Sequence, residues 1–149
     1  MALSGQDTDG NPPGVPVADG PIESAPSGLR YIEEKPGDGR VPSTGQTVQV
    51  SYTGWLVDGT KFDTSDDHGG SFVFNLGQGQ VIRGWDEGLA TMREHGKRRL
   101  ILPPQLAYGP NGSPPVIPPN ATLIFDVGQG TQDLGFRAEM PILFTIKKE

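Results

Sequence analysis

The chain has 149 residues and no cysteine, with 12 basic and 18 acidic side chains and a net charge of −6. This length favours a single domain, the acidic balance argues against a nucleic-acid partner, and the lack of cysteine excludes disulfides and thiolate chemistry. No apolar run is long enough to span a membrane, and Met1 leads straight into polar sequence without a visible secretory leader. We therefore expect a cytoplasmic monomer without membrane contacts, with export after leader removal as the alternative.

Residues 1–26 are rich in glycine, proline, aspartate and serine, and their scattered apolar residues follow neither a helical nor a strand period. This composition predicts a disordered or weakly held tail, with a docking segment as the alternative. We expect the ordered domain to begin near Ser27 and to extend over residues 27–127.

Several segments have the alternating, β-branched or aromatic composition of strands. They are residues 28–34, 47–57, 61–65, 72–76, 96–102 and 122–127. Gly54 interrupts the second of these segments, which indicates a bulge or a close approach of another group to the backbone. Asp58-Gly59 predicts a hairpin turn directly after it.

One short helix is expected over residues 84–94. Trp85, Leu89 and Met92 recur at the spacing of a single helical face, and Gly96 follows at a usual stop position. A tryptophan on the apolar face of a lone helix among strands indicates packing against a sheet. The whole pattern predicts an α+β domain with one antiparallel sheet of five or more strands and one helix across a face.

Three further stretches have less regular patterns. The basic run at residues 97–99 is interpreted as the solvated edge of a strand, with a docking patch as the alternative. Residues 105–120 form a long proline-rich loop, which is usually functional or disordered at this length. Gly128-Gln129-Gly130 is expected to break the strand at 122–127, and residues 142–146 are again β-prone.

The candidate site is aromatic rather than metal-binding or nucleophilic. His68 and His95 are far apart in polar stretches, so we expect no metal and no other cofactor. Aromatic side chains instead recur on several expected elements: Tyr52, Phe62, Phe72, Phe74, Trp85, Tyr108 and Phe125. Ordinary core packing is the alternative, and we favour it for Phe74. For the set as a whole we predict a concave apolar pocket with a few polar groups, the usual form of a small-ligand site.

Four motifs, in order and spacing, carry a resemblance to a known family. They are SYTGWLVDGTKFDTS (51–65), FNLGQGQVIRGWDEGL (74–89), LAYG (106–109) and VIPPNATLIFDV (116–127). From about Ser27 to Val127 the chain resembles the FKBP-type peptidyl-prolyl cis-trans isomerases, immunophilins that bind the macrolides tacrolimus and rapamycin. The resemblance implies a curled five- or six-stranded antiparallel sheet wrapped around one short helix.

The resemblance also implies a role for each matching residue. Trp85 is the expected floor of the pocket, and its walls are Tyr52, Phe62, Phe72 and Phe125. Asp63 is the expected buried carboxylate that pairs with the Tyr52 hydroxyl and faces the ligand. The expected rim is Val81 and Ile82, with the Ile82 backbone N–H placed to bind a carbonyl. The overhanging loop would contribute Tyr108, Val116 and Ile117.

The implied activity is acceleration of rotation about X–Pro peptide bonds during protein folding, with tacrolimus or rapamycin as inhibitors. This reaction breaks no bond, so it requires neither a nucleophile nor a metal. The alternative is a non-catalytic module in which the same pocket holds proline-containing peptides as a chaperone or docking surface.

The chain departs from the family pattern at three places. Where the loop after Asp63 often carries an arginine near the pocket carboxylate, this chain has Asp66-Asp67-His68. The tip of the long loop has Ser113 where some members carry a bulky residue. After Val127, residues 128–149 replace the usual closing strand, and they either complete the sheet edge or form an appended tail that pairs elsewhere.

Overall fold

The computed structural model describes residues 10–132, which form a sheet of seven strands, one α-helix and three short 3-10 helices. The strands are β1 (Ile22–Ser24), β2 (Arg30–Lys35), β3 (Thr47–Leu56), β4 (Lys61–Thr64), β5 (Phe72–Asn75), β6 (Lys97–Leu102) and β7 (Leu123–Gln132). The helices are α2 (Arg83–Gly88), η1 (Ser65–His68), η2 (Pro104–Leu106) and η3 (Gly109–Asn111). None of the helices in this part of the chain has the length and apolar character needed to cross a membrane.

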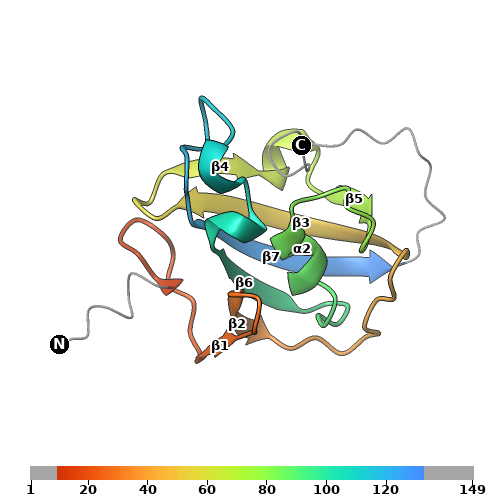
Figure 1. Ribbon diagram of the computed structural model, residues 1–149. Coiled ribbons are helices and arrows are strands. Elements are labelled where there is room, and N and C mark those ends of the chain that lie inside the picture. The colour runs from red at the N-terminus through yellow and green to blue at the C-terminus, as the bar shows by residue number, and fades with distance from the viewer. Residues whose placement is uncertain (1–9, 133–149) are drawn as a thin grey trace.

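All strand pairs are antiparallel, in the order β1-β2-β6-β7-β3-β4, and β5 pairs with β3 on the same side as β4 (Figure 1). The long strand β3 therefore has β7 along one side and shares its other side between β5 and β4. The predicted α+β class and the sheet wrapped around one helix are confirmed. The sheet has one strand more than the five or six that the family resemblance implied. The additional strand is β1, which lies before Ser27, the expected start of the domain.

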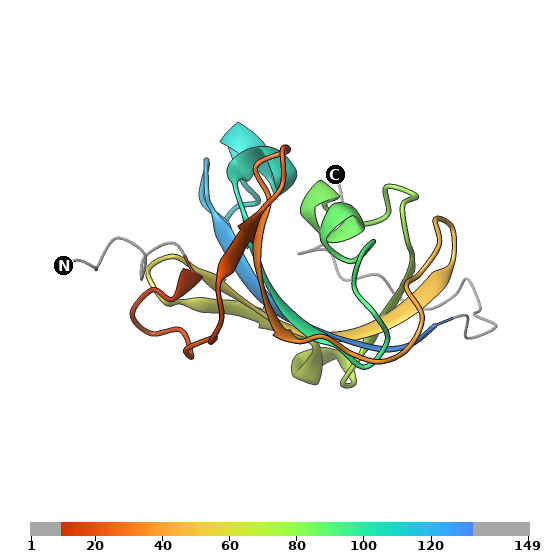
Figure 2. The ribbon, with the colours of Figure 1, turned by 90° about the horizontal axis from the view of Figure 1, so that it is seen from below.

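The sheet curls, and α2 lies across its concave face (Figure 2). The helix approaches β6 closely because two of its residues are glycines. A Cβ atom at Gly84 would overlap the side chain of Leu102, and one at Gly88 would lie 2.7 Å from a methyl group of Leu100. Glycine in a helix is less favourable than alanine by roughly 1 kcal/mol. The close contact between α2 and the sheet offsets this loss of helix stability.

The helix is shorter than the predicted span of 84–94, because it ends at Gly88. The chain continues in turns, in which the Leu89 N–H donates to the Trp85 carbonyl and the Met92 N–H donates to the Leu89 carbonyl. Both Leu89 and Met92 remain fully buried. The apolar spacing therefore identified the buried residues correctly. The last two of them lie in turns that follow the α-helix.

Residues 10–21, hereafter the N-terminal segment, precede β1, and part of this segment packs on the outer face of the sheet. Val15 forms a small apolar cluster with Trp55 and Ile124. The fully buried Arg99 guanidinium donates to the carbonyls of Gly10 (2.8 Å) and Pro16 (2.7 Å). The predicted disordered tail over residues 1–26 therefore does not describe residues 10–26; residues 1–9 lie outside the described part.

The prediction of a solvated basic edge at residues 97–99 is wrong for two of its three side chains. Strand β6 lies inside the sheet between β2 and β7, and Arg98 and Arg99 are 5% and 0% exposed. Arg98 pairs with Glu33 and donates to the Gly88 carbonyl at 2.9 Å. Arg99 makes a bidentate pair with Asp126 at 2.7 and 3.0 Å. Each buried arginine is compensated by partners distant in the sequence.

Two expected irregular regions are also more regular than predicted. Strand β7 does not break at Gly128, because Gly128 pairs with both Ser51 of β3 and Lys97 of β6, and the strand continues to Gln132. Residues 128–132 therefore extend the sheet, while the β-prone segment at 142–146 lies outside the described residues. The loop at 105–120 contains η3, the end of η2, and a bridge between Ser113 and Ile117.

We expect the Arg99→Met substitution to lower the free energy of unfolding by about 3–5 kcal/mol, because it leaves the Asp126 carboxylate without its main cation. Urea denaturation measures the loss. Arg83→Met, at an exposed residue of α2, is the matched control and should change stability little. Adding Asp126→Asn to Arg99→Met should recover part of the stability; no recovery in the double variant would contradict the ion-pair explanation.

Glu34 predicts a pH dependence of stability. Burial, and then the nearby Asp126 carboxylate, raise the pKa of Glu34 to about 7, although Lys97 lies 3.8 Å away and opposes this shift. Because the folded pKa is above the unfolded value, this group favours folding most below the unfolded pKa and loses that contribution as pH rises through about 7. We expect Glu34→Gln to stabilise the protein at about pH 8 and to flatten its stability profile between about pH 5 and 8. Urea denaturation across this range tests it; an unchanged profile would exclude Glu34 as the titrating group.

Candidate active site

The Trp85 indole lies at the centre of an aromatic cluster on the concave face. Trp85 is fully buried, and its ring centroid lies 5.1 Å from Tyr52 and 5.3 Å from Phe125, both nearly edge-to-face. Phe74 and Phe72 lie at 5.9 and 6.1 Å. These partners come from β3, β5 and β7, so one side chain of the helix contacts three strands. Edge-to-face packing of this kind is favourable beyond the area that it buries.

Phe62, which packs on Phe125, is the ring of this cluster that is partly exposed. Their ring centroids are 5.5 Å apart, and Phe62 is only partly buried. Gly54 lies beneath both rings: a Cβ atom there would be 2.7 Å from Phe62 and 2.8 Å from Phe125. The β3–β4 register also shifts between Gly54 and Trp55. The bulge or close approach predicted at Gly54 is confirmed, and both are present.

One buried carboxylate borders this aromatic cluster. The Tyr52 hydroxyl donates to Asp63 Oδ2 at 2.7 Å, and the Thr64 backbone N–H donates to Oδ1 at 2.9 Å. Burial, and then the hydrogen bond to Asp63, raise the pKa of Tyr52 well above its usual value. Tyr52 therefore stays protonated and remains a donor to Asp63. The pairing that the family resemblance implied for these two residues is present in the structure.

His68 is a part of this site that the sequence interpretation did not assign. Its Nε2 atom lies 2.9 Å from Asp63 Oδ1, and its side chain is 34% exposed, against 6% for Asp63. The available signal was its position, five residues after Asp63, in the loop where the family often has an arginine. Sequence alone showed that the arginine was absent, but not which neighbour of Asp63 replaced it.

The remaining candidate residues surround the same core. Val81 and Ile82 are buried directly before α2, and the Ile82 backbone is extended. Ile117 is buried, while Tyr108 and Val116 are partly buried and pack against this core from the long loop. The structure therefore brings together all the predicted site residues: Tyr52, Phe62, Asp63, Phe72, Val81, Ile82, Trp85, Tyr108, Val116, Ile117 and Phe125.

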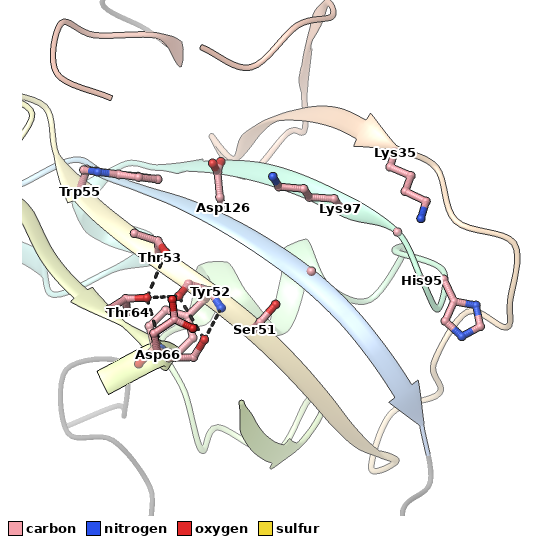
Figure 3. Close-up of a pocket in the computed structure, with 13 residues that line it drawn as sticks. Lys35, Ser51, Tyr52, Thr53, Trp55, Thr64, Asp66, His95, Lys97 and Asp126 are labelled. Carbon is pink, nitrogen blue, oxygen red and sulfur yellow. Dashed lines mark hydrogen bonds between the residues drawn. The ribbon is translucent and has the colours of Figure 1, made fainter. Parts of the chain in front are cut away.

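A separate hollow of about 450 Å³ lies on the outer face of the sheet (Figure 3). Trp55 lies at one end of it, Lys35 and His95 lie at the other, and Ser51 and Thr53 line its middle. Its walls are mainly polar and carry charges of both signs. This hollow differs from the aromatic cluster in location and chemistry. Within residues 10–132, no group of three or more acidic, histidine or cysteine side chains is arranged to hold a metal.

Residues 39–128 match the family model described as FKBP-type peptidyl-prolyl cis-trans isomerase. The chain belongs to this FKBP family. The family match begins at Gly39, so the N-terminal segment held by Arg99 lies outside it. The aromatic cluster and Asp63 lie inside it.

Relatives and solved structures agree with this assignment. The peptidyl-prolyl cis-trans isomerase Fkbp12 of Drosophila melanogaster is 52% identical over 101 residues, which are 67% of this chain and 94% of that protein. The FK506-binding protein of Neisseria meningitidis serogroup B is 49% identical over 100 residues, 67% of this chain and 92% of that protein. The crystal structure of AtFKBP13 superposes with a TM-score of 0.71 and 36% identity, over 72% of this chain and 95% of that one. FkpA from Escherichia coli has a TM-score of 0.70 and 42% identity, over 75% of this chain and 51% of that one.

We expect Gly54→Ala to displace the Phe62 or Phe125 ring and to lower the free energy of unfolding by about 1–3 kcal/mol through overpacking. Near-ultraviolet circular dichroism reports the change in aromatic packing, and urea denaturation reports the stability. Thr53→Ala, at the preceding residue, is the control. Unchanged aromatic circular dichroism in Gly54→Ala would show that the rings do not need this glycine.

Proposed function

We propose that this FKBP-family chain is a peptidyl-prolyl cis-trans isomerase that rotates X–Pro bonds of polypeptides in the aromatic site of the concave face. The observation that carries the proposal is the aromatic cluster around Trp85 together with the Asp63 carboxylate, which Tyr52 holds at its border. An apolar cluster with one oriented polar group suits a proline ring and its adjacent carbonyl.

The reaction that such a site must accelerate is rotation about a partial double bond. The uncatalysed barrier is roughly 18–20 kcal/mol, because the C–N bond shares the carbonyl π electrons. The two isomers of an X–Pro bond differ by only about 1 kcal/mol, so interconversion is slow although neither side is strongly preferred. A thousandfold acceleration requires about 4 kcal/mol of stabilisation that is specific to the transition state.

The aromatic site can stabilise the transition state selectively because the twisted amide is less polar than the planar one. A twisted amide has lost resonance, so its carbonyl is less polar than that of the planar ground state. Removing the planar amide from water therefore costs more than removing the twisted one, and an apolar site favours the twisted form. In this proposal Trp85 supports the proline ring, while the Ile82 N–H, Asp63 and Tyr108 orient the rotating carbonyl.

The same site is proposed to bind tacrolimus, also called FK506, and rapamycin as competitive inhibitors. Two relatives that match most of their length to this chain are named FK506-binding proteins, from Emericella nidulans and Neisseria meningitidis. A macrolide that occupies the aromatic walls would exclude a proline-containing substrate.

The test is turnover of a short proline peptide in a protease-coupled assay, with and without tacrolimus. We expect Trp85→Ala and Phe62→Ala to lower kcat/KM by about tenfold or more, since each loss of about 1.4 kcal/mol in transition-state stabilisation is tenfold. Asp63→Asn should cost less, because no proton transfer is proposed. Ser51→Ala, on the outer face, is the control. Full activity in folded Phe62→Ala would reject the aromatic site as the place of catalysis.

A further inference from the structure

We propose that Asp86 is a positioning residue for the aromatic site, because its carboxylate holds the loop that presents the backbone of Ile82 to the substrate. This role rests on the proposed isomerase function and adds to it a residue that supports binding without touching the ligand. The proposed mechanism uses the Ile82 N–H to orient the rotating carbonyl, so it depends on whatever fixes the backbone at this residue.

Residues 76–82, hereafter the rim loop, connect β5 to α2 through turns and bends. Gly77 and Gly79 have positive φ angles of 77° and 72°, a conformation that glycine adopts much more readily than other residues. Ile82 is the last residue of this loop and is only 2% exposed. Because the rim loop contains no helix or strand, the direction of the Ile82 N–H depends on the contacts that hold the loop.

The Asp86 carboxylate binds the rim loop to the helix that follows it. The Gly77 N–H donates to Oδ1 at 2.8 Å, and the Gly79 N–H donates to Oδ2 at 3.1 Å. Each carboxylate oxygen thus accepts from one backbone amide, and hydrogen bonds to an ionised acceptor are roughly twice as strong as neutral ones. Asp86 directly follows Trp85, so neighbouring residues of α2 form the centre of the aromatic cluster and hold the rim beside it.

The rim loop has other backbone hydrogen bonds only at its ends. At its start, the Leu76 N–H donates to the Gln46 carbonyl at 2.9 Å. At its end, the Ile82 carbonyl accepts from the Trp85 N–H at 3.0 Å. Between these ends, the hydrogen bonds that the loop backbone makes within the described part of the chain are the two to the Asp86 carboxylate. Loss of this carboxylate would therefore release the middle of the loop.

A purely structural role for Asp86 makes a different prediction, which the adjacent residue can test. A negative charge in the first turn stabilises a helix, and Asp86 lies in the first turn of α2. Glu87 is the next residue of the same helix, but its two carboxylate oxygens lie 2.7 and 2.6 Å from the Ser27 hydroxyl. Its carboxylate therefore contacts a different part of the chain, and Glu87→Gln removes a charge from α2 without removing a contact to the rim loop.

The loss of the rim contacts should appear in KM rather than in kcat. In the proposed mechanism the Ile82 N–H binds the substrate carbonyl in the planar and in the twisted state. Losing a contact that both states share raises KM while kcat changes little. A released rim loop must also be ordered when the ligand binds, and this ordering lowers affinity.

The experiment compares wild type with Asp86→Asn, Asp86→Glu, Gly79→Ala and Glu87→Gln. Asparagine has one amide oxygen to accept with, and its NH₂ group faces the other glycine amide, whereas glutamate keeps both carboxylate oxygens. Gly79→Ala disturbs the loop independently: its Cβ atom would meet nothing within 4 Å, but the positive φ is unfavourable for alanine. Turnover of a short proline peptide gives kcat and KM, amide hydrogen exchange follows Gly77 and Gly79, and thermal unfolding checks each variant.

We expect Asp86→Asn to raise KM about fivefold, the effect of losing about 1 kcal/mol of binding, with kcat within about twofold of wild type. The Gly77 amide, the Gly79 amide or both should exchange faster in this variant. Asp86→Glu should recover most of the wild-type KM, because the carboxylate is restored. Gly79→Ala should raise KM in the same way, and Glu87→Gln should leave KM unchanged.

The outcomes separate this role from the function on which it rests. Wild type that does not isomerise the peptide would reject the proposed function, and the role of Asp86 with it. Active wild type and faster exchange in Asp86→Asn, but an unchanged KM, would reject the role of Asp86 alone. An equal rise of KM in Glu87→Gln would assign the effect to the stability of α2 instead. If Asp86→Asn did not fold, an unchanged KM in Gly79→Ala would reject the role.

Discussion

The packing of Trp85 between α2 and the sheet is the contact on which both fold and site depend. Its indole touches rings from β3, β5 and β7, and the glycines at 84 and 88 bring the helix close enough for this contact. The candidate pocket is therefore built from the same side chains that hold the helix to the sheet. These side chains are buried and closely packed, which suits a reaction that depends on orientation and desolvation rather than on reactive groups.

The sequence alone predicted those elements in which buried side chains recur at a regular spacing along the chain. Alternation over residues 47–57 reports one buried face of β3, and the spacing of Trp85, Leu89 and Met92 reports the buried side of the helical region. The spacing of apolar residues does not show which backbone hydrogen bonds form. The predicted end of α2 was therefore six residues too late. The resemblance to a family supplied the candidate site residues, and the geometry places them together.

The misassigned parts depend on partners that are distant in sequence. A basic run is usually solvated, because burying an unpaired charge is costly, and only the fold reveals that Arg98 meets Glu33 and that Arg99 meets Asp126. The N-terminal segment has too few apolar residues to predict order, yet Arg99 binds its carbonyls and Val15 covers Trp55. Strand β7 likewise continues past Gly128 because β3 supplies the pairing that the local composition does not favour.

The alternation of β3 explains how one thin sheet can serve two separate electrostatic environments. Tyr52 points to the concave side, where its hydroxyl reaches Asp63 and, through it, His68. Its neighbours Ser51 and Thr53 line the outer hollow together with Asp126, which Glu34 and Arg99 share. Successive side chains of a strand point to opposite faces, so Asp126 in the outer hollow and the Glu34 side chain beside it are separated from the aromatic cluster by the sheet backbone. A substitution of Glu34 can therefore change the pH dependence of stability while leaving the side chains of the aromatic cluster in place.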